Sequence, residues 1–389
     1  MIMKNILCFK SIIVAASLVA VLVSAGQGRA LETIAREAIL IDVETGETIL
    51  EKDADASMPP ASMSKLMTLY ILFQRLRDGS IKMEDTLLVS ENAWRRGGAK
   101  SGSSTMFLVP GKRVKVEDLI LGIIVQSGND ACIVVAEGLA GSEEAFAEEM
   151  TSTAHTIGMT KSTFHNATGW PDPKHRMTAR DLATLAKRII VDFPQFYKFF
   201  KVTEFTYNKI KQHNRNPLLY KDIGADGLKT GHTKEAGYGL TASAKRDDRR
   251  LILVVNGLKS KKERTREPER LLMWGLREYN NYALFKAGET VDAASVWLGR
   301  SKTVPLVITQ DVKITLPRKS RKKLKVTVKF DGPVPAPIIK GTEIARVLIA
   351  APGRATMVIP LVAGENVEQL GLVGRLGAAF NSIVWGPSG

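Results

Sequence analysis

The stretch PPASMSKLMTLY, Pro59–Tyr70, places two serines and one lysine at the edge of a strongly apolar run. The two prolines block a helix upstream, so we expect a helix to begin near Ser62. The run from Ser62 to Leu76 is apolar almost all round, which predicts a buried central helix. A lone buried ammonium group is costly, so Lys65 needs a chemical reason to be there.

Spacing selects one serine as the partner of this lysine. Residues three apart share a helix face, so Ser62 can meet Lys65, whereas Ser64 cannot. A serine hydroxyl becomes a good nucleophile when a base takes its proton, and lysine is such a base only when burial or nearby positive charge lowers its pKa. The same pattern recurs at Ser320 and Lys323, inside the basic run RKSRKKLK, where no apolar helix comes after it; we predict a solvated surface there.

Two further groups make a catalytic interpretation of Ser62 stronger. The segment QSGNDA sets Ser127 and Asn129 in a glycine turn between apolar segments, where a hydroxyl and an amide can reach one cleft. The segment DGLKTGHT sets Lys229, Thr230 and Gly231 at the start of a predicted strand, and Gly231 permits close backbone approach by a ligand. The order is therefore S-x-x-K, S-x-N, K-T-G.

These motifs resemble the signature of penicillin-binding proteins and serine β-lactamases. More narrowly, PPASMSKLMT, IVQSGNDACIVVAEGLAGSEEAFAEEM, FHNATGWPDP, FTYNKIKQHNRNPLL and DGLKTGHTKEAGYGLTASA are similar to the exported D-alanyl-D-alanine carboxypeptidases, over about residues 31–285. The resemblance implies an α+β fold, in which a five-stranded antiparallel sheet is sandwiched by helices as in the β-lactamase and transpeptidase fold. After Lys286, short β-type segments between Gly, Pro and charged turns predict a small all-β sandwich domain.

The termini carry targeting signals. Lys4 and Lys10 precede an apolar run of roughly 15 residues, the length of a signal-peptide core, and cleavage after Ala25 or Ala30 fits. The alternative is an uncleaved N-terminal anchor. We therefore predict a signal peptide at 1–30, a carboxypeptidase domain at 31–285, an all-β domain at 286–364, and a weak amphipathic helix at 365–389. That last helix is a candidate membrane anchor, or it packs on its own domain or frays.

Charge and cysteine content indicate which partners and which covalent bonds an exported chain of this kind can have. The net charge is +15, and the densest basic run is Arg318 to Lys325. In an exported chain the fitting anionic partner is a membrane surface or a wall polymer, not nucleic acid, and the alternative is a solvated edge without a partner. Loss of Cys8 with the leader leaves only Cys132, so no internal disulfide forms. We expect a periplasmic protein, peripheral on the inner membrane through its C-terminus.

The resemblance implies hydrolysis of the terminal D-Ala–D-Ala bond of peptidoglycan stem peptides, with β-lactam antibiotics as covalent inhibitors. Ser62 is the implied nucleophile, Lys65 its base, and Ser127 the group that passes a proton to the leaving D-Ala. Asn129 would hold the substrate amide and help to orient Lys65. Lys229 would make the cleft positive and help to lower the pKa of Lys65.

Recognition of the substrate carboxylate is implied for Thr230 and an arginine, since a guanidinium offers a rigid donor fork. Matching back from LLMWG places the family's arginine at Arg264, with Arg266 as the nearby alternative. Backbone N–H groups of Ser62 and His232 would form the oxyanion hole. The His232 side chain either assists the deacylating water or is a strand-edge histidine without a catalytic role.

Three other functions compete with a carboxypeptidase. A class A β-lactamase deacylates with a glutamate and a bound water, and the nearest candidate, Glu204 in EFTYN, does not fit the pattern. An endopeptidase that cuts cross-links usually lacks the second domain, and a non-catalytic wall-binding module would not need every catalytic residue type. The histidines show no H-E-x-x-H spacing, so we expect neither a metal nor another cofactor.

Overall fold

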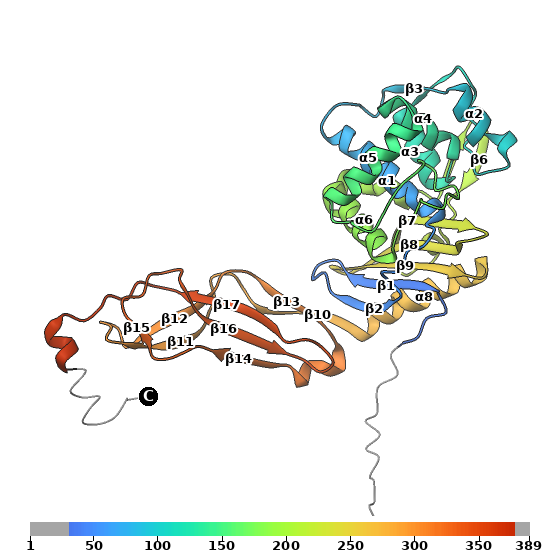
Figure 1. Ribbon diagram of the computed structural model, residues 1–389. Helices are drawn as coiled ribbons and strands as arrows, with labels where there is room; N and C mark the ends of the chain where they lie inside the picture. The colour runs from blue at the N-terminus through green and yellow to red at the C-terminus, as the bar shows by residue number, and fades with distance from the viewer. Residues whose placement is uncertain (1–30, 378–389) are drawn as a thin grey trace, which may run out of the picture. The chain divides into compact units, whose positions relative to one another are not determined.

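The computed structural model describes residues 31–377, and the predicted signal peptide at 1–30 lies outside the described residues. Two separate hydrophobic cores form within this part of the chain (Figure 1). The larger core draws on helices and sheet residues from Ile39 to Val254. The smaller one draws on residues from Ala294 to Val367. Each core stabilises its own set of elements.

The first set is built on a five-stranded antiparallel sheet of order β2-β1-β9-β8-β7. Its strands are β1 (Glu37–Asp42), β2 (Thr48–Lys52), β7 (Ala225–Thr233), β8 (Gly237–Arg246) and β9 (Arg249–Leu258). Strands β1 and β2 form a hairpin around the TGE turn that their alternating apolar pattern predicts, and β8 and β9 pair around a charged turn in the same way. Strand β7, which carries the K-T-G motif, lies at the edge of the sheet.

Helices cover both faces of this sheet, as expected. The helices of the first set are α1 (Lys65–Arg77), α2 (Glu91–Gly97), α3 (Val116–Val125), α4 (Asn129–Ala140), α5 (Glu143–Thr156), α6 (Ala179–Asp192), α7 (Pro194–Tyr197) and α8 (Lys261–Glu278). Helix α6 packs on β1, β8 and β9 from one side, and α8 packs on the same strands from the other (Figure 1). Close packing of α8 requires Gly275, since a Cβ there would lie 2.8 Å from Leu40 and 2.9 Å from Leu251.

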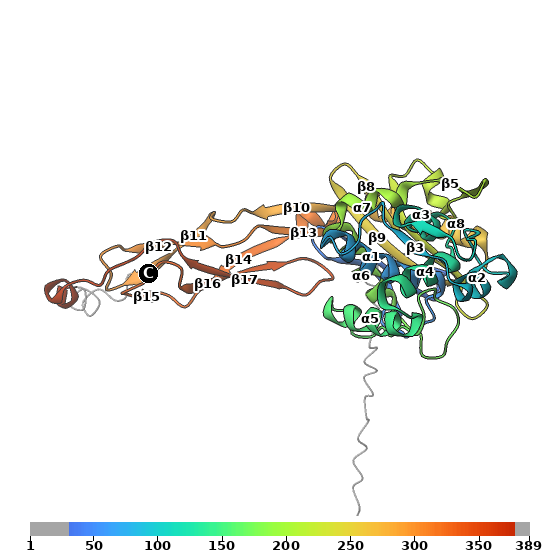
Figure 2. The same cartoon turned by 90° about the horizontal axis from the view of Figure 1, so that it is seen from above.

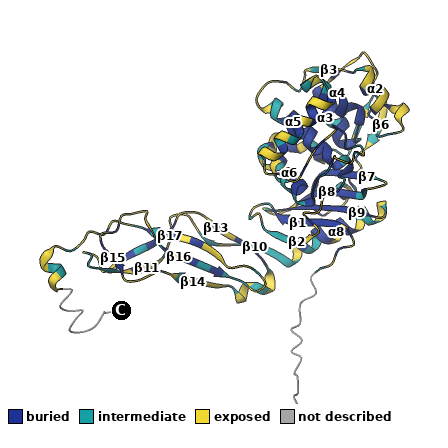
Figure 3. Ribbon diagram, in the orientation of Figure 1, coloured by how far each residue is buried: buried dark blue, intermediate teal, exposed yellow. Residues whose placement is uncertain are grey.

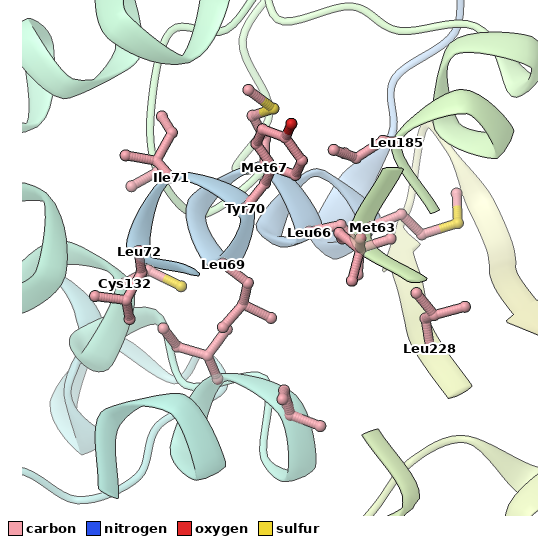
Figure 4. Close-up of a cluster of buried hydrophobic side chains, with 14 of the residues drawn as sticks. Met63, Leu66, Met67, Leu69, Tyr70, Ile71, Leu72, Cys132, Leu185 and Leu228 are labelled. Atoms are coloured by element: carbon pink, nitrogen blue, oxygen red, sulfur yellow. The ribbon is translucent and has the colours of Figure 1, made fainter. Parts of the chain in front are cut away.

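The apolar run after Ser62 forms the centre of the larger core (Figure 3). Every residue of α1 from Lys65 to Phe73 is buried, which confirms the predicted central helix. Its side chains reach helices α4 and α6 and strand β7 through Cys132, Leu185 and Leu228 (Figure 4). Ser62 itself lies just before this helix, in a 3-10 turn, η1 (Ala61–Ser64), because the chain enters the turn with φ of 49° at Ala61.

One expected helix is shorter than its sequence indicated. The composition of EPERLLMWGLREYNNYALF predicts a helix through Phe285, but α8 ends at Glu278 and Tyr279–Phe285 is a strand, β10. Arg249 explains the stop, because its guanidinium donates to the carbonyls of Gly275 (3.0 Å) and Tyr279 (2.8 Å). The last helical hydrogen bond runs from the Tyr279 N–H to the Gly275 carbonyl, and β10 then pairs with β13 (Val312–Pro317).

The second set is all-β, as predicted. Its six-stranded sheet has the order β14-β16-β17-β12-β11-β15, beside the pair β10 and β13. The six strands are β11 (Thr290–Trp297), β12 (Thr303–Ile308), β14 (Lys325–Lys329), β15 (Val334–Pro335), β16 (Glu343–Ala350) and β17 (Met357–Ala363). A basic 3-10 turn, η5 (Arg318–Lys323), joins β13 to β14. Two small antiparallel pairs of strands belong to the first set: β3 (Thr86–Leu88) with β4 (Arg113–Lys115), and β5 (Glu204–Tyr207) with β6 (Ile210–His213).

The C-terminal segment differs from the expected helix at 365–389 in where helix begins. Val367 and Gln369 form isolated β-bridges with Ile338 and Gly299, and residues 372–377 are helical. Residues 378–389 lie outside the described residues. In the described part of the chain, none of the helices combines the length and the hydropathy needed to cross a membrane.

Candidate active site

The nucleophile and base predicted from the sequence meet at the start of α1. Lys65 is completely buried, and its Nζ donates to Ser62 Oγ at 3.0 Å and to the main-chain carbonyl of Thr168. Ser62 is only partly buried, so its hydroxyl remains open to a substrate. Ser64 instead donates to the carbonyl of Ala61 at 3.1 Å and closes the 3-10 turn, so its hydroxyl has a structural partner.

The surroundings of Lys65 favour its neutral form. Its pKa is lowered from 10.5 to about 8, mainly by burial and to a smaller extent by the positive charge of Arg215. The carboxylates of Glu143 and Asp130 act in the opposite direction. Burial also raises the pKa of the neighbouring free thiol, Cys132, to about 12, so that thiol is protonated at neutral pH. An appreciable fraction of Lys65 is therefore neutral near pH 8.

A loop without a predicted catalytic role holds Thr168 in place. Asn166 Oδ1 accepts from the N–H groups of Thr168, Gly169 and Trp170 at 2.7–3.2 Å. The residue before Thr168, Ala167, donates its N–H to Glu143 at 3.1 Å and accepts from the Thr68 hydroxyl at 2.8 Å. The loop carbonyl that binds Lys65 is thus fixed by α1, α5 and its own asparagine.

A second serine–lysine pair lies near the first, close enough for the two lysine charges to interact. Ser127 is held with φ of 62° in the turn between α3 and α4, and Lys229 Nζ donates to its hydroxyl at 2.9 Å. Lys229 is buried, and burial together with the charges of Lys65 and Arg215 holds its pKa well below the usual range. Asp130 stabilises the turn, since its carboxylate accepts the N–H groups of Met106 and Leu108.

Asn129 and Gly231 contribute in different ways. Asn129 begins α4, and its Oδ1 is buried without a hydrogen-bond partner in the described structure. An orphaned acceptor of this kind costs stability unless a ligand satisfies it. Close packing requires a glycine at position 231, for a reason that the sequence did not indicate. A Cβ there would lie 2.9 Å from the Pro60 carbonyl and 3.1 Å from Met63. It lets β7 approach the turn that carries Ser62.

The outer end of the K-T-G strand carries positive charge. His232 is exposed and stacks on Tyr238 with ring centroids 3.9 Å apart, while Arg264 lies over the same tyrosine ring at 5.4 Å. Burial, and to a smaller extent the charges of Arg264 and Lys261, lowers the pKa of His232. Arg264 is half-buried and its Nε has no partner in the described structure, whereas Arg266 is exposed.

Comparison with known proteins agrees with this geometry. Residues 24–260 match the model of the D-alanyl-D-alanine carboxypeptidase family, Peptidase S11. The chain belongs to this family of serine-type carboxypeptidases. Residues 279–369 of the carboxypeptidase match the C-terminal domain of penicillin-binding protein 5. It is 41% identical to the D-alanyl-D-alanine carboxypeptidase DacC of Escherichia coli, over 88% of this chain and 86% of that one.

Solved structures share this fold in whole or in part. Penicillin-binding protein 5 of Haemophilus influenzae superimposes with a TM-score of 0.77 at 35% identity, covering 87% of this chain and 99% of that one. DacD of Francisella tularensis gives 0.79 at 31% identity, covering 87% and 95%. Penicillin-binding protein D2 of Listeria monocytogenes, with ampicillin bound, gives 0.55 at 30% identity, covering 64% and 99%.

Glu204 and Lys323, which the sequence patterns disfavoured as catalytic residues, are both exposed. Glu204 is exposed on β5, and its carboxylate pairs with Lys211 at 2.8 Å. Lys323 is exposed in η5, as predicted for the second S-x-x-K copy. Sequence reasoning missed Arg215, which bonds Ser104 at 2.6 Å and lowers the pKa of Lys65, Lys229 and Arg264. Arg215 lies in the stretch FTYNKIKQHNRNPLL, which resembles the family, but its effect on the lysines was not predicted because it depends on proximity in space.

Proposed function

We propose that the carboxypeptidase removes the terminal D-Ala from peptidoglycan pentapeptide stems through an acyl-enzyme on Ser62. The observation that carries the proposal is the buried Lys65 ammonium, 3.0 Å from Ser62 Oγ, with its pKa lowered to about 8. Neutral Lys65 takes the Ser62 proton while Oγ attacks the carbonyl of the penultimate D-Ala. The C–N bond breaks, D-Ala leaves, and water then hydrolyses the ester.

Protonation of the leaving group is assigned to Ser127. Its hydroxyl already accepts from Lys229 at 2.9 Å, so a proton passed to the departing nitrogen can be replaced through this hydrogen bond. Asn129 is assigned to the substrate amide, because its buried Oδ1 needs a donor such as a peptide N–H. Its proposed second task, orienting Lys65, has no hydrogen bond among the described residues to support it.

Recognition of the substrate's C-terminal carboxylate is assigned to Thr230 and Arg264. Thr230 is buried beside Lys229 on β7, and Arg264 offers an unpaired Nε on the same side of the cleft. A fork of two N–H donors fits a carboxylate better than a point charge does. The His232 side chain, stacked on Tyr238, is assigned to shaping this end of the cleft.

The oxyanion is assigned to the backbone N–H groups of Ser62 and His232. Strand β7 is the edge of the sheet, so one side of its backbone is free of a partner strand. Removing one oxyanion donor typically costs about 3 kcal/mol of transition-state stabilisation. The same site would be acylated by β-lactams, in line with the ampicillin-bound Listeria relative.

Intact-mass measurement after penicillin treatment, followed by peptide mapping, tests the nucleophile. We expect a single adduct on Ser62, and an adduct on any other residue would overturn the assignment. Release of D-Ala from a soluble pentapeptide, compared with cleavage of a cross-linked dimer, separates the carboxypeptidase from an endopeptidase. Steady turnover of penicillin would instead indicate a β-lactamase.

Location is proposed from the two ends of the chain. Residues 1–30 carry the features of a signal peptide for export to the periplasm, and the helical residues 372–377 expose Leu372, Val373 and Leu376 at 71–86%. Exposed apolar side chains of this kind suit an interface with lipid. Fractionation of the full-length protein against a chain shortened to end at Gly364 tests it: we expect membrane association for the full-length protein only.

A further inference from the structure

A dense positive surface lies in the all-β domain, outside the machinery assigned to catalysis. We call it the basic surface and define it by six side chains: Arg318, Lys319, Arg321, Lys322, Lys323 and Lys325. All six are exposed. Within residues 31–377 none of them forms an ion pair, and the one ring contact is Arg321 over Tyr282 at 4.9 Å. Unneutralised like charges repel one another, so such a surface suits an anionic partner.

Protection of a sheet edge explains only part of this surface. Strand β14 is the edge of the six-stranded sheet, and lysines on edge strands commonly prevent pairing with other chains. Lys325 and Lys329 lie on β14 and fit that role. The five basic residues of η5 precede the strand and add nothing to its protection. They need a different explanation.

The position of the basic surface decides which anionic partner it can reach. Strands β10 and β11 follow one another, and β12 and β13 return alongside them (Figure 2). Pro317, directly before η5, pairs with Tyr279 at the base of this long hairpin, whereas Gln369 bridges Gly299 at its tip. At roughly 3.3 Å per strand residue the base and tip lie on the order of 40 to 50 Å apart. The basic surface and the C-terminal segment therefore occupy opposite ends of the all-β domain.

We propose that the basic surface binds peptidoglycan itself, through the carboxylates that its stem peptides repeat along the polymer. The proposal rests on the proposed function, in which peptidoglycan is the substrate and its stem peptides end in carboxylates. If residues 372–377 lie on a membrane, the basic surface is held several Debye lengths away from it, and salt screens the attraction between charges over about 8 Å at physiological ionic strength. A polymer of repeated carboxylates can engage several side chains at once, so weak contacts add.

Cosedimentation with purified peptidoglycan sacculi tests the proposal. The variant K319Q/K322Q/K323Q removes three charges from the basic surface, and K286Q/K302Q/K340Q removes the same number from exposed lysines elsewhere in the all-β domain. We expect the first variant to bind sacculi at least about fivefold more weakly than the wild type, with a shallower dependence on salt. The second should bind like the wild type. Equal loss in both would overturn the proposal, because it would reflect overall charge only.

Two further measurements separate the partners and the functions. Vesicles containing an anionic lipid should bind both variants alike; selective loss by K319Q/K322Q/K323Q on vesicles, with sacculus binding intact, would mean a membrane partner and overturn the proposal. D-Ala release from a soluble pentapeptide should be equal in all three proteins, while release from sacculi should fall in the first variant alone. Absence of soluble-peptide turnover in the wild type would refute the proposed function, yet leave the sacculus-binding result readable.

Discussion

The two S-x-x-K segments of this protein have the same spacing and each has its serine in a 3-10 turn, yet only one of them buries its lysine. Ser62 lies in η1 and Ser320 in η5, both 3-10 turns. Lys65 is fully buried and donates to Ser62, whereas Lys323 is exposed among other cations. The two segments differ in the element that comes after each turn. An apolar helix removes Lys65 from water, but an edge strand leaves Lys323 in it.

Burial is not the only difference between the surroundings of Lys65 and those of Lys323. Lys65 also has a carbonyl partner at Thr168, which is brought from 103 positions along the chain. The η5 turn has no such partner for its lysine among the described residues. A short motif is therefore chemically active only when distant segments enclose it. That enclosure can be broken at several points, with effects of decreasing size.

The largest effect is expected from removing the nucleophile. Ser62→Ala should abolish covalent labelling by penicillin and lower kcat/KM for D-Ala release by at least about 10³-fold, because no acyl-enzyme forms. Ser320→Ala should leave both unchanged. Intact-mass spectrometry and release of D-Ala from a pentapeptide measure the two effects. Labelling that persists in Ser62→Ala would refute the role of the η1 segment.

The base should show itself in the pH dependence. Because neutral Lys65 is required and its pKa is about 8, kcat/KM for acylation should rise as pH increases and level off above an apparent pKa near 8. That apparent value belongs to the coupled pair of Lys65 and Lys229. A K323Q variant should give a superimposable profile. A flat profile between pH 6 and 9 would contradict the assignment of Lys65.

Contact between β7 and the η1 turn should matter next. Gly231→Ala would place a Cβ 2.9 Å from the Pro60 carbonyl and push the turn away from the strand. We expect a loss of about 1–3 kcal/mol in the free energy of unfolding and slower acylation. Gly371→Ala, which meets no atom within 4 Å, is the matched control and should be neutral. Denaturant unfolding measures the first effect; wild-type stability in Gly231→Ala would mean that the turn moves freely.

The smallest effect is expected at Glu143. Its carboxylate raises the pKa of Lys65, so Glu143→Gln should lower that pKa and move the acidic limb of the kcat/KM profile to lower pH. Glutamine can still accept the Ala167 N–H, so the fold should be kept. Glu144→Gln, one residue along and exposed, is the control and should not move the limb. A shift in the opposite direction would show that Glu143 acts through structure instead.

Elements with strong local patterns were predictable from the sequence. The β1–β2 hairpin, the β8–β9 pair and the apolar α1 each result from periodicity and turn residues. The partners of Lys65 and Lys229 at the cleft were also predictable, because spacing and motif order name Ser62 and Ser127. The end of α8 was not. It depends on Arg249, which reaches the helix carbonyls from a different strand.

The groups that escaped prediction are those whose effect requires the folded chain. Thr168 contributes a main-chain carbonyl, which no residue type signals. Arg215 acts through its charge on two lysines, one of them far away in sequence. Gly231 was predicted to admit a ligand, yet the atoms it admits are those of Pro60 and Met63. In each case the decisive distance is created by packing between segments.

The Thr168 carbonyl has a consequence for how such an enzyme can change over generations. A mutation can delete a side-chain partner but not a backbone oxygen, so the codon for residue 168 can vary while the lysine keeps its acceptor. Selection under antibiotic exposure would then act on the residues that hold the loop, such as Asn166 and Glu143. Substitutions at these positions would move the Thr168 carbonyl oxygen by small steps. Transplanting a lysine base into another scaffold likewise calls for a fitted loop as well as a residue.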